Sequence, residues 1–167
     1  MLNQSAQIPG MVFPHSMLKS IVDTPIGETV ATRFGEVMID TDKKLLFPRG
    51  LLGMPDKFNF ALAKFPSPKM QQFTLLQSLD DKALSFITLA LGMENPIIAE
   101  SDIRAICNDL HIDEQALVFL LIVSVHRSPD QLRLSVNARA PLLIDGERKT
   151  GVQYVFQKEA YKVQHML

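Results

Sequence analysis

The sequence feature that most constrains the fold is a series of short segments in which apolar and polar residues alternate. Leu132, Leu134 and Val136, for example, alternate with the polar residues Arg133 and Ser135. Side chains two positions apart lie on the same face of a β-strand, so this period gives a segment one apolar face. Residues that favour turns separate the segments. The chain is therefore predicted to form many short strands.

About ten strands are expected at this spacing. Their predicted ranges are 29–33, 36–40, 45–47, 58–65, 73–78, 84–91, 117–125, 132–136, 141–144 and 151–156. The seventh of these ranges is nearly continuous in apolar residues, which is typical of a central strand. We expect a mostly β fold: a small antiparallel β-barrel-like domain with one or two short helices.

One segment has the period of a helix instead of a strand. Between Ser101 and Leu110 the apolar residues recur three and four positions apart, which places them on one helix face; they are Ile103, Ile106, Cys107 and Leu110. Ser101 is the predicted N-cap residue, and Asp102 falls in the first turn, where a negative charge is favourable. This segment is the predicted helix of the barrel domain.

The first 27 residues differ from the rest of the chain. They contain three prolines and two glycines, and their short apolar pieces show no sustained period. We interpret residues 1–27 as an extended N-terminal arm and residues 28–167 as the barrel domain. The apolar pieces of the arm could lie on the domain or on a partner, and a frayed leader is the alternative.

Composition excludes several classes of protein. The formal net charge is −1, which argues against direct binding of nucleic acid, because phosphate binding requires a basic surface. No apolar run reaches the length of a membrane helix, about 20 residues. The single cysteine, Cys107, permits no internal disulfide bond, which suits the cytoplasm. Cys107 is interpreted as a small buried hydrophobe, with a nucleophile as the alternative.

Known catalytic and metal-binding patterns are missing from the sequence. The adjacent carboxylates Asp80 and Asp81 fall in a predicted turn, where aspartates bond their own backbone. No histidine has a partner at a recognised metal spacing, and no cofactor is expected. The alternative hypothesis is a small β-barrel ligand-binding protein or hydrolase, in which Asp80, Asp81 and His126 converge on a pocket. A structural subunit with an exposed apolar surface is a third possibility.

A loop and a charged region are the candidate interaction sites. The loop consists of Gly50, Leu51, Leu52, Gly53 and Met54, which is apolar for a connection. Either it folds onto the core, or it offers an apolar contact to a partner. Residues 80–114 hold eight acidic and two basic residues, so this region is expected to attract a basic partner and repel RNA. Asp80, Asp81, Asp102 and Asp109 are the acidic residues singled out for partner binding.

A series of motifs in the barrel domain resembles the FliW family of flagellar assembly factors. The resemblance is carried, in order, by TRFGEV at 32–37, FPRGLLGM at 47–54, LQSLDD at 76–81 with LSFI at 84–87, NARAPLLID at 137–145, and YKVQHML at 161–167. Met54 stands where the family commonly has an aromatic residue, and Asp145 where it has asparagine. The first 27 residues have no recognised counterpart.

The resemblance implies a β-barrel-like fold without catalysis and two protein partners. These partners are flagellin and the RNA-binding translational regulator CsrA. In the family, export of flagellin frees the factor, which then binds CsrA and lifts the repression of flagellin synthesis. The resemblance thus implies partner switching controlled by relative affinity and concentration.

Overall fold

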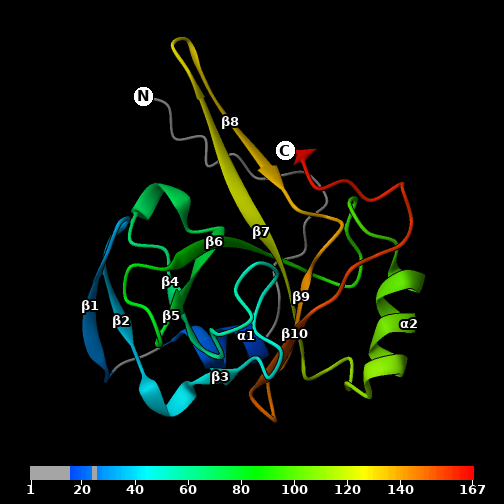
Figure 1. Ribbon diagram of the computed structural model, residues 1–167, viewed down its shortest axis with the longest axis horizontal. Helices are drawn as coiled ribbons and strands as arrows, with labels where there is room; N and C mark the ends of the chain where they lie inside the picture. Colours follow the sequence, from blue (N-terminus) through cyan, green and yellow to red (C-terminus); the bar gives the residue numbers. More distant parts are fainter. Residues whose placement is uncertain (1–15, 24–25) are drawn as a thin grey trace.

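Seven strands of the protein close into a barrel in the computed structural model, which describes residues 16–23 and 26–167 (Figure 1). The order around the barrel is β7, β6, β5, β4, β3, β10, β9 and back to β7. The barrel strands are β3 (Leu45–Leu46), β4 (Asn59–Lys64), β5 (Phe73–Ser78), β6 (Ser85–Leu91), β7 (Leu117–Ser128), β9 (Leu142–Asp145) and β10 (Thr150–Gln153). All neighbours are antiparallel except β3 and β10, which are parallel. The predicted fold class is confirmed.

The first half of strand β7 joins the two ends of the sheet. Its residues Leu117–Leu120 pair with β9, while Phe119–Ile122 pair with β6. Its second half leaves the barrel and pairs with β8 (Gln131–Val136), forming a hairpin that projects from the body of the molecule (Figure 1). The short strand β11 (His165–Met166) adds to the base of β8.

The barrel interior is filled with hydrocarbon. Alternate residues of each strand point inward, as the period of two predicts, and they form one buried cluster; it includes Leu45, Phe60, Leu62, Leu76, Ala90, Val118, Leu120, Leu142 and Ile144. Thr74 and Thr88 are polar residues on the inward face, and their buried hydroxyl groups lie 2.7 Å apart and bond each other. Hydrophobic burial of this kind is the main stabilising term of a domain.

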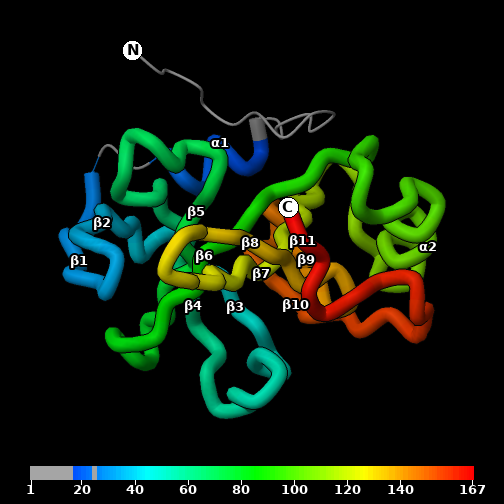
Figure 2. Tube along the Cα trace, turned by 90° about the horizontal axis from the view of Figure 1, so that it is seen from above, coloured from blue at the N-terminus to red at the C-terminus, as the bar shows by residue number. Residues whose placement is uncertain are grey.

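The outward faces of the barrel strands carry two further layers. Helix α2 (Glu100–Leu110) buries Ile103, Ile106 and Cys107 against outward residues of β6, β7 and β9. On the other side, the ribbon of β1 (Glu28–Thr32) and β2 (Gly35–Ile39) buries Val37 and Ile39 against β4 and β5. Figure 2 shows the ribbon and α2 on opposite sides of the barrel. Two 3₁₀ turns, Thr41–Lys43 and Pro68–Met70, connect neighbouring strands.

Helix α1 (Ser16–Val22) was not predicted. It buries Ile21 and Val22 in the same cluster as the barrel interior, so it covers part of the barrel. Gly146 makes room for it, because a Cβ atom there would lie 2.5 Å from Cγ and Sδ of Met17. The expected extended conformation is thus wrong for residues 16–22. The sequence did not reveal this helix because a helix of two turns is too short to show a hydrophobic period. Residues 1–15 and 24–25 lie outside the described residues, and the boundary at residue 28 stays a prediction.

Two local predictions also need correction. Helix α2 begins at Glu100, and its N-cap residue is Ala99, two positions before the predicted Ser101, without a side-chain cap. Asn95 and the Tyr161 hydroxyl accept the backbone N–H groups of residues 97–99, which fixes the chain just before the helix. The last predicted strand ends at Gln153 instead of Phe156. The N–H groups of Tyr154 and Phe156 still bond the carbonyl oxygens of Pro141 and Arg139, but Pro141 has no N–H to return a bond, so the regular ladder stops there.

Candidate protein-interaction surfaces

The loop of residues 50–54 folds onto the barrel and exposes one leucine. Leu51 is buried, and its backbone forms an isolated bridge with Met54, which packs against the barrel interior. Leu52 points outward with 56 % of its surface exposed, while its N–H bonds the Gln153 side chain at 2.8 Å. The loop therefore combines the two interpretations of the sequence: it is anchored to the core and still presents an apolar side chain.

Both glycines of this loop adopt backbone angles that favour glycine. The φ angles of Gly50 and Gly53 are 65° and 79°. At Gly50 a Cβ atom would also lie 2.4 Å from the Met54 carbonyl oxygen. Gly50 is thus required by the fold of the loop, and Leu52 is the residue of the loop that is free to contact a partner.

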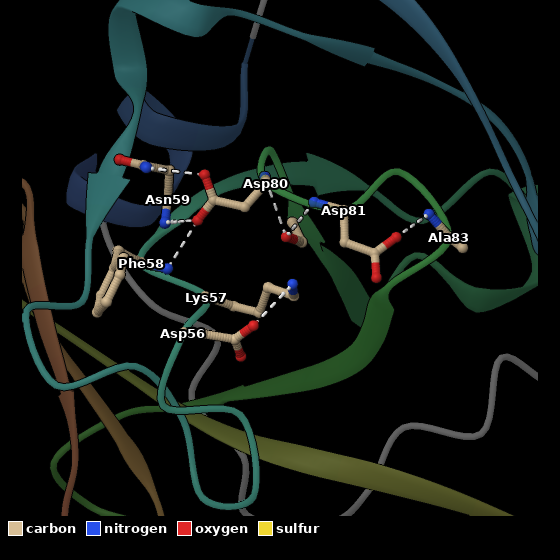
Figure 3. Close-up of polar contacts among 8 residues, drawn as sticks. Asp56, Lys57, Phe58, Asn59, Asp80, Asp81 and Ala83 are labelled. Atoms are coloured by element: carbon tan, nitrogen blue, oxygen red, sulfur yellow. Dashed lines mark hydrogen bonds and ion pairs between the residues drawn. The ribbon is translucent and has the colours of Figure 1, made fainter.

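The turn between β5 and β6 uses its two carboxylates in different ways (Figure 3). Asp80 accepts hydrogen bonds from the backbone N–H groups of Phe58 and Asn59 at 2.7 and 2.9 Å, and from the Asn59 side chain at 2.9 Å. Asp81 accepts from the N–H of Ala83 at 3.0 Å. The bonds donated by Asn59 and Phe58 hold the pKa of Asp80 below its ordinary value. Asp80 therefore ties the turn to β4. Its negative charge is partly neutralised by these hydrogen-bond donors, which makes it less available to a partner.

The first turn of α2 is tethered to the C-terminal segment through Asp102. This carboxylate accepts hydrogen bonds from the Lys158 ammonium, at 2.5 Å, and from the Tyr161 hydroxyl. These two donors hold the pKa of Asp102 below its ordinary value, the ammonium more strongly than the hydroxyl. The Asp102 side chain is 16 % exposed. Asp102 therefore holds α2 against the C-terminal segment, and replacing it by lysine is expected to disturb the fold.

Asp109 lies on the solvent side of the same helix. It is exposed, and no residue among 16–23 and 26–167 forms an ion pair with it. Two other acids of this region, Glu100 and Glu114, share Arg104, with separations of 2.6 and 3.8 Å. Of the four singled-out aspartates, Asp109 thus keeps the most accessible charge.

The residues of the alternative catalytic hypothesis make separate contacts. His126 lies on the projecting hairpin, where its Nε2 is 2.7 Å from the Ser135 hydroxyl. Within the part of the chain that the structure describes, no hydrogen bond or ion pair joins His126 to Asp80 or Asp81. A cleft beside α1 and another beside β10 are lined by other residues. No observation on the structure favours this hypothesis.

Cys107 has the environment of a buried hydrophobe. It is 1 % exposed among the apolar residues under α2, and burial raises the pKa of its thiol to about 11. The thiolate is the nucleophilic form of cysteine, so the thiol is unreactive near neutral pH.

Two features of the described residues concern metals and membranes. Residues 16–23 and 26–167 hold no group of three or more histidine, cysteine or acidic side chains that could bind a metal ion. In the same residues, no helix combines the length and apolarity that crossing a membrane requires.

The sequence did not point to two surface features. The hairpin of β7 and β8 exposes Val125 and Leu132, which lie beyond the barrel on the face that is buried lower down. A cleft of about 640 Å³ lies between α1 and the connection from β4 to β5. The hairpin was missed because the hydrophobic period locates strands but not the point where they leave the barrel. The cleft was missed because the sequence of α1 shows no period.

Comparison with models of known protein families matches most of the chain to one family. The family model described as FliW protein matches residues 28–167, which include all eleven strands of the described residues and α2 but exclude α1. That range agrees with the order of motifs noted in the sequence.

Relatives of similar length carry one shared name. Proteins named flagellar assembly factor FliW from Geotalea uraniireducens and Alkaliphilus metalliredigens are 29 % and 27 % identical to this chain. The first alignment covers 83 % of this chain and 82 % of the relative, and the second covers 80 % and 82 %. The matched region is thus most of both proteins.

A solved structure has the same fold. The crystal structure of a flagellar assembly factor FliW superposes with a TM-score of 0.60 at 22 % identity, covering 83 % of this chain and 96 % of the other. The fold of the matched part of the chain is therefore shared with that protein.

Proposed function

Because the chain belongs to the FliW family, we propose that it is a non-catalytic flagellar assembly factor that binds flagellin and the translational regulator CsrA in turn. The observation that carries this proposal is the match of residues 28–167 to the family, with relatives named flagellar assembly factors. The barrel supports it, since buried apolar side chains occupy its interior. We place the protein in the cytoplasm, where both partners are made.

Two surfaces are proposed for partner contact. Leu52, at the tip of the anchored loop, offers an apolar side chain that a partner can cover. The acidic surface around α2, with Asp109 as its most accessible carboxylate, suits a basic RNA-binding protein. Its charge would also repel the RNA that competes for the same regulator.

Competition between the purified partners tests the proposal. Flagellin and the CsrA-type regulator of the same organism are each titrated with the full chain by calorimetry, and then in the presence of the other. We expect each to bind alone, and flagellin to reduce the binding of the regulator. Failure of both partners to bind would refute the proposal, and independent binding would refute the switch.

The electrostatic part has its own test. Asp109→Lys is expected to slow association with the regulator at low salt, and the difference from the parent protein should shrink as salt rises. Asp130→Lys is the matched control, because Asp130 is also an exposed carboxylate and lies at the tip of the projecting hairpin. Equal slowing by both substitutions would show that general charge, and not the α2 surface, matters.

A further inference from the structure

The cleft beside helix α1 has an apolar floor and is large enough to hold a side chain of a partner. Its volume is about 640 Å³, within the range of clefts that hold ligands or several side chains, ~300–1,000 Å³. Leu18 and Val22 of α1 form one wall, and Phe65, Pro66 and Phe73 line the opposite side. Such a floor suits an apolar side chain and not an isolated ion.

The rim of this cleft is basic on a chain whose net charge is slightly negative. Lys19 and Lys64 line the cleft, and their side chains are 80 % and 73 % exposed. Both approach the carboxylate of Asp23, Lys64 at 2.6 Å and Lys19 at 4.0 Å. Among the described residues that line the cleft, Asp23 is the one acidic residue.

Further lysines add to this imbalance. Lys43 donates a hydrogen bond to the backbone carbonyl of Asp23 at 2.6 Å, and exposed Lys69 follows the lining residue Pro68. The Asp23 carboxylate is thus shared by two ammonium groups, with two further lysines nearby in the fold or the sequence, which leaves positive charge around an apolar floor. This combination is complementary to an acidic segment with an apolar side chain.

We propose that the cleft between α1 and the connection from β4 to β5 binds a peptide segment of a protein partner, in which an apolar side chain is flanked by acidic residues. The apolar side chain enters between Leu18 and Phe73, and the flanking carboxylates meet Lys19 and Lys64. Each ion pair at such an exposed rim contributes little alone, so the apolar contact supplies most of the affinity and the charges select the partner.

This site is distinct from Leu52 and the acidic surface around α2, the two surfaces proposed above for partner contact. The family match begins at residue 28, whereas one wall of the cleft consists of residues 18–23. Helix α1, which forms one wall of the cleft, also lies apart from α2 (Figures 1 and 2). The first turn of α2 carries Glu100 and Asp102, so the surroundings of the two helices differ in charge. The chain's own first 15 residues contain no aspartate or glutamate, so the basic rim does not favour them as the occupant.

Binding of a defined peptide tests the proposal. The probe is the fluorescein-labelled heptapeptide Glu-Asp-Leu-Phe-Leu-Asp-Glu, titrated with the full chain by fluorescence anisotropy at low salt. We expect saturable binding that weakens as salt rises, with amide shifts in NMR spectra confined to residues 18–23 and 64–74. The peptide Lys-Arg-Leu-Phe-Leu-Arg-Lys, with the same apolar centre, should not saturate.

Charge-reversal variants locate the binding. Lys19→Glu combined with Lys64→Glu is expected to weaken binding at least about tenfold. The matched control combines Lys82→Glu with Lys162→Glu, two exposed lysines away from the cleft, and should change affinity less than about twofold. Melting curves of all variants verify that they are folded. Leu18→Ser, which alters the floor without changing charge, should also weaken binding.

Several results would overturn the proposal. Among them are no saturation up to about 1 mM of the acidic peptide, equal binding of the basic peptide, and equal loss in both charge-reversal pairs. A dimer of the full chain that the Lys19→Glu and Lys64→Glu pair dissociates would assign the cleft to a second copy. Nuclear Overhauser contacts from residues 1–15 to Phe65 or Phe73 would assign it to the chain's own N-terminal segment.

Discussion

At the scale of single residues, the barrel depends on small side chains that let large ones fill the interior. Gly151 in β10 is such a position, because a Cβ atom there would lie 2.5 Å from Cζ of Phe47, whose ring is fully buried. The Phe47 ring also packs edge-on against Phe60, with ring centroids 5.4 Å apart. A ring held on several sides cannot move away from an added methyl group without disturbing its neighbours.

Gly151→Ala is therefore expected to destabilise the protein by about 1–3 kcal/mol through overpacking. Urea denaturation measures the change. Combining it with Phe47→Leu should cost less than the sum of the two single changes, since the smaller side chain relieves the clash. A stability of Gly151→Ala equal to that of the parent would show that Phe47 is free to shift.

Neighbouring carboxylates can also differ in their roles at this scale. Asp80 accepts three hydrogen bonds from Phe58 and Asn59, whereas Asp81 accepts one from Ala83 (Figure 3). The adjacent residues share one residue type and one turn, yet only Asp80 joins two strands of the barrel.

We expect Asp80→Ala to cost about 1–2 kcal/mol, because two backbone N–H groups and an amide lose a charged acceptor. Asp81→Ala is the control in the same turn, and its cost should be clearly smaller. Thermal unfolding followed by circular dichroism compares the two. If Asp81→Ala proved the more costly change, the assignment of Asp80 as the structural carboxylate would be wrong.

At the scale of elements, helix α2 and the C-terminal segment hold each other in place. Tyr161 is buried beside Phe156, with ring centroids 4.6 Å apart, and its hydroxyl reaches the N-terminus of α2. The same hydroxyl accepts the backbone N–H of Ala99 at 3.1 Å and donates to Asp102. The helix start therefore depends on a residue about sixty positions further along the chain.

This tether predicts a dependence of stability on acid pH. The pKa of Asp102 is lowered in the folded state, so its contribution is fully present above the ordinary aspartate value of ~3.9. It is lost as the pH falls from there through the lowered value of the folded protein. Asp102→Asn should flatten the decline of unfolding free energy below about pH 4, as measured by urea denaturation. Asp109→Asn, without an ion-pair partner in the described residues, should keep the parent's slope. An unchanged slope in Asp102→Asn would contradict the tether.

At the scale of the whole molecule, the barrel separates two surfaces of opposite charge. The acidic surface lies around α2, and the basic rim surrounds the cleft beside α1. Figures 1 and 2 show these two helices apart from each other. Exposed charges that are separated by more than a Debye length, about 8 Å at physiological salt, are largely screened from each other. We therefore expect each proposed surface to attract its partner with little electrostatic influence from the other surface.

We expect the two surfaces to respond to substitution independently. The Lys19→Glu and Lys64→Glu pair should change the association rate of the CsrA-type regulator by less than about twofold, while Asp109→Lys slows it. Stopped-flow fluorescence at low salt measures both rates. A comparable effect of the lysine pair would mean that the regulator approaches from the side of α1 or senses only the net charge.

Local pattern alone determined the strands, the main helix and the filled interior. Alternation places neighbouring side chains on opposite faces whatever the partners of a strand are, and the strands from β1 to β9 lie within a few residues of their expected positions. The period of residues 101–110 located α2 for the same reason. Of the adjacent carboxylates, Asp81 bonds the backbone of its own turn as predicted, whereas Asp80 bonds the backbone of Phe58 and Asn59 instead.

Only the tertiary structure decided which elements close the barrel and which carboxylates stay free. Pairing of β3 with β10 and of β7 with β9 joins residues far apart in the chain, and helix α1 depends on burying Ile21 and Val22 in the barrel cluster. Asp102 and Asp109 look alike in sequence, yet Tyr161 and Lys158 engage only the first. A local pattern reports the conformation of a segment, whereas long-range contacts arise only when the fold brings distant residues together.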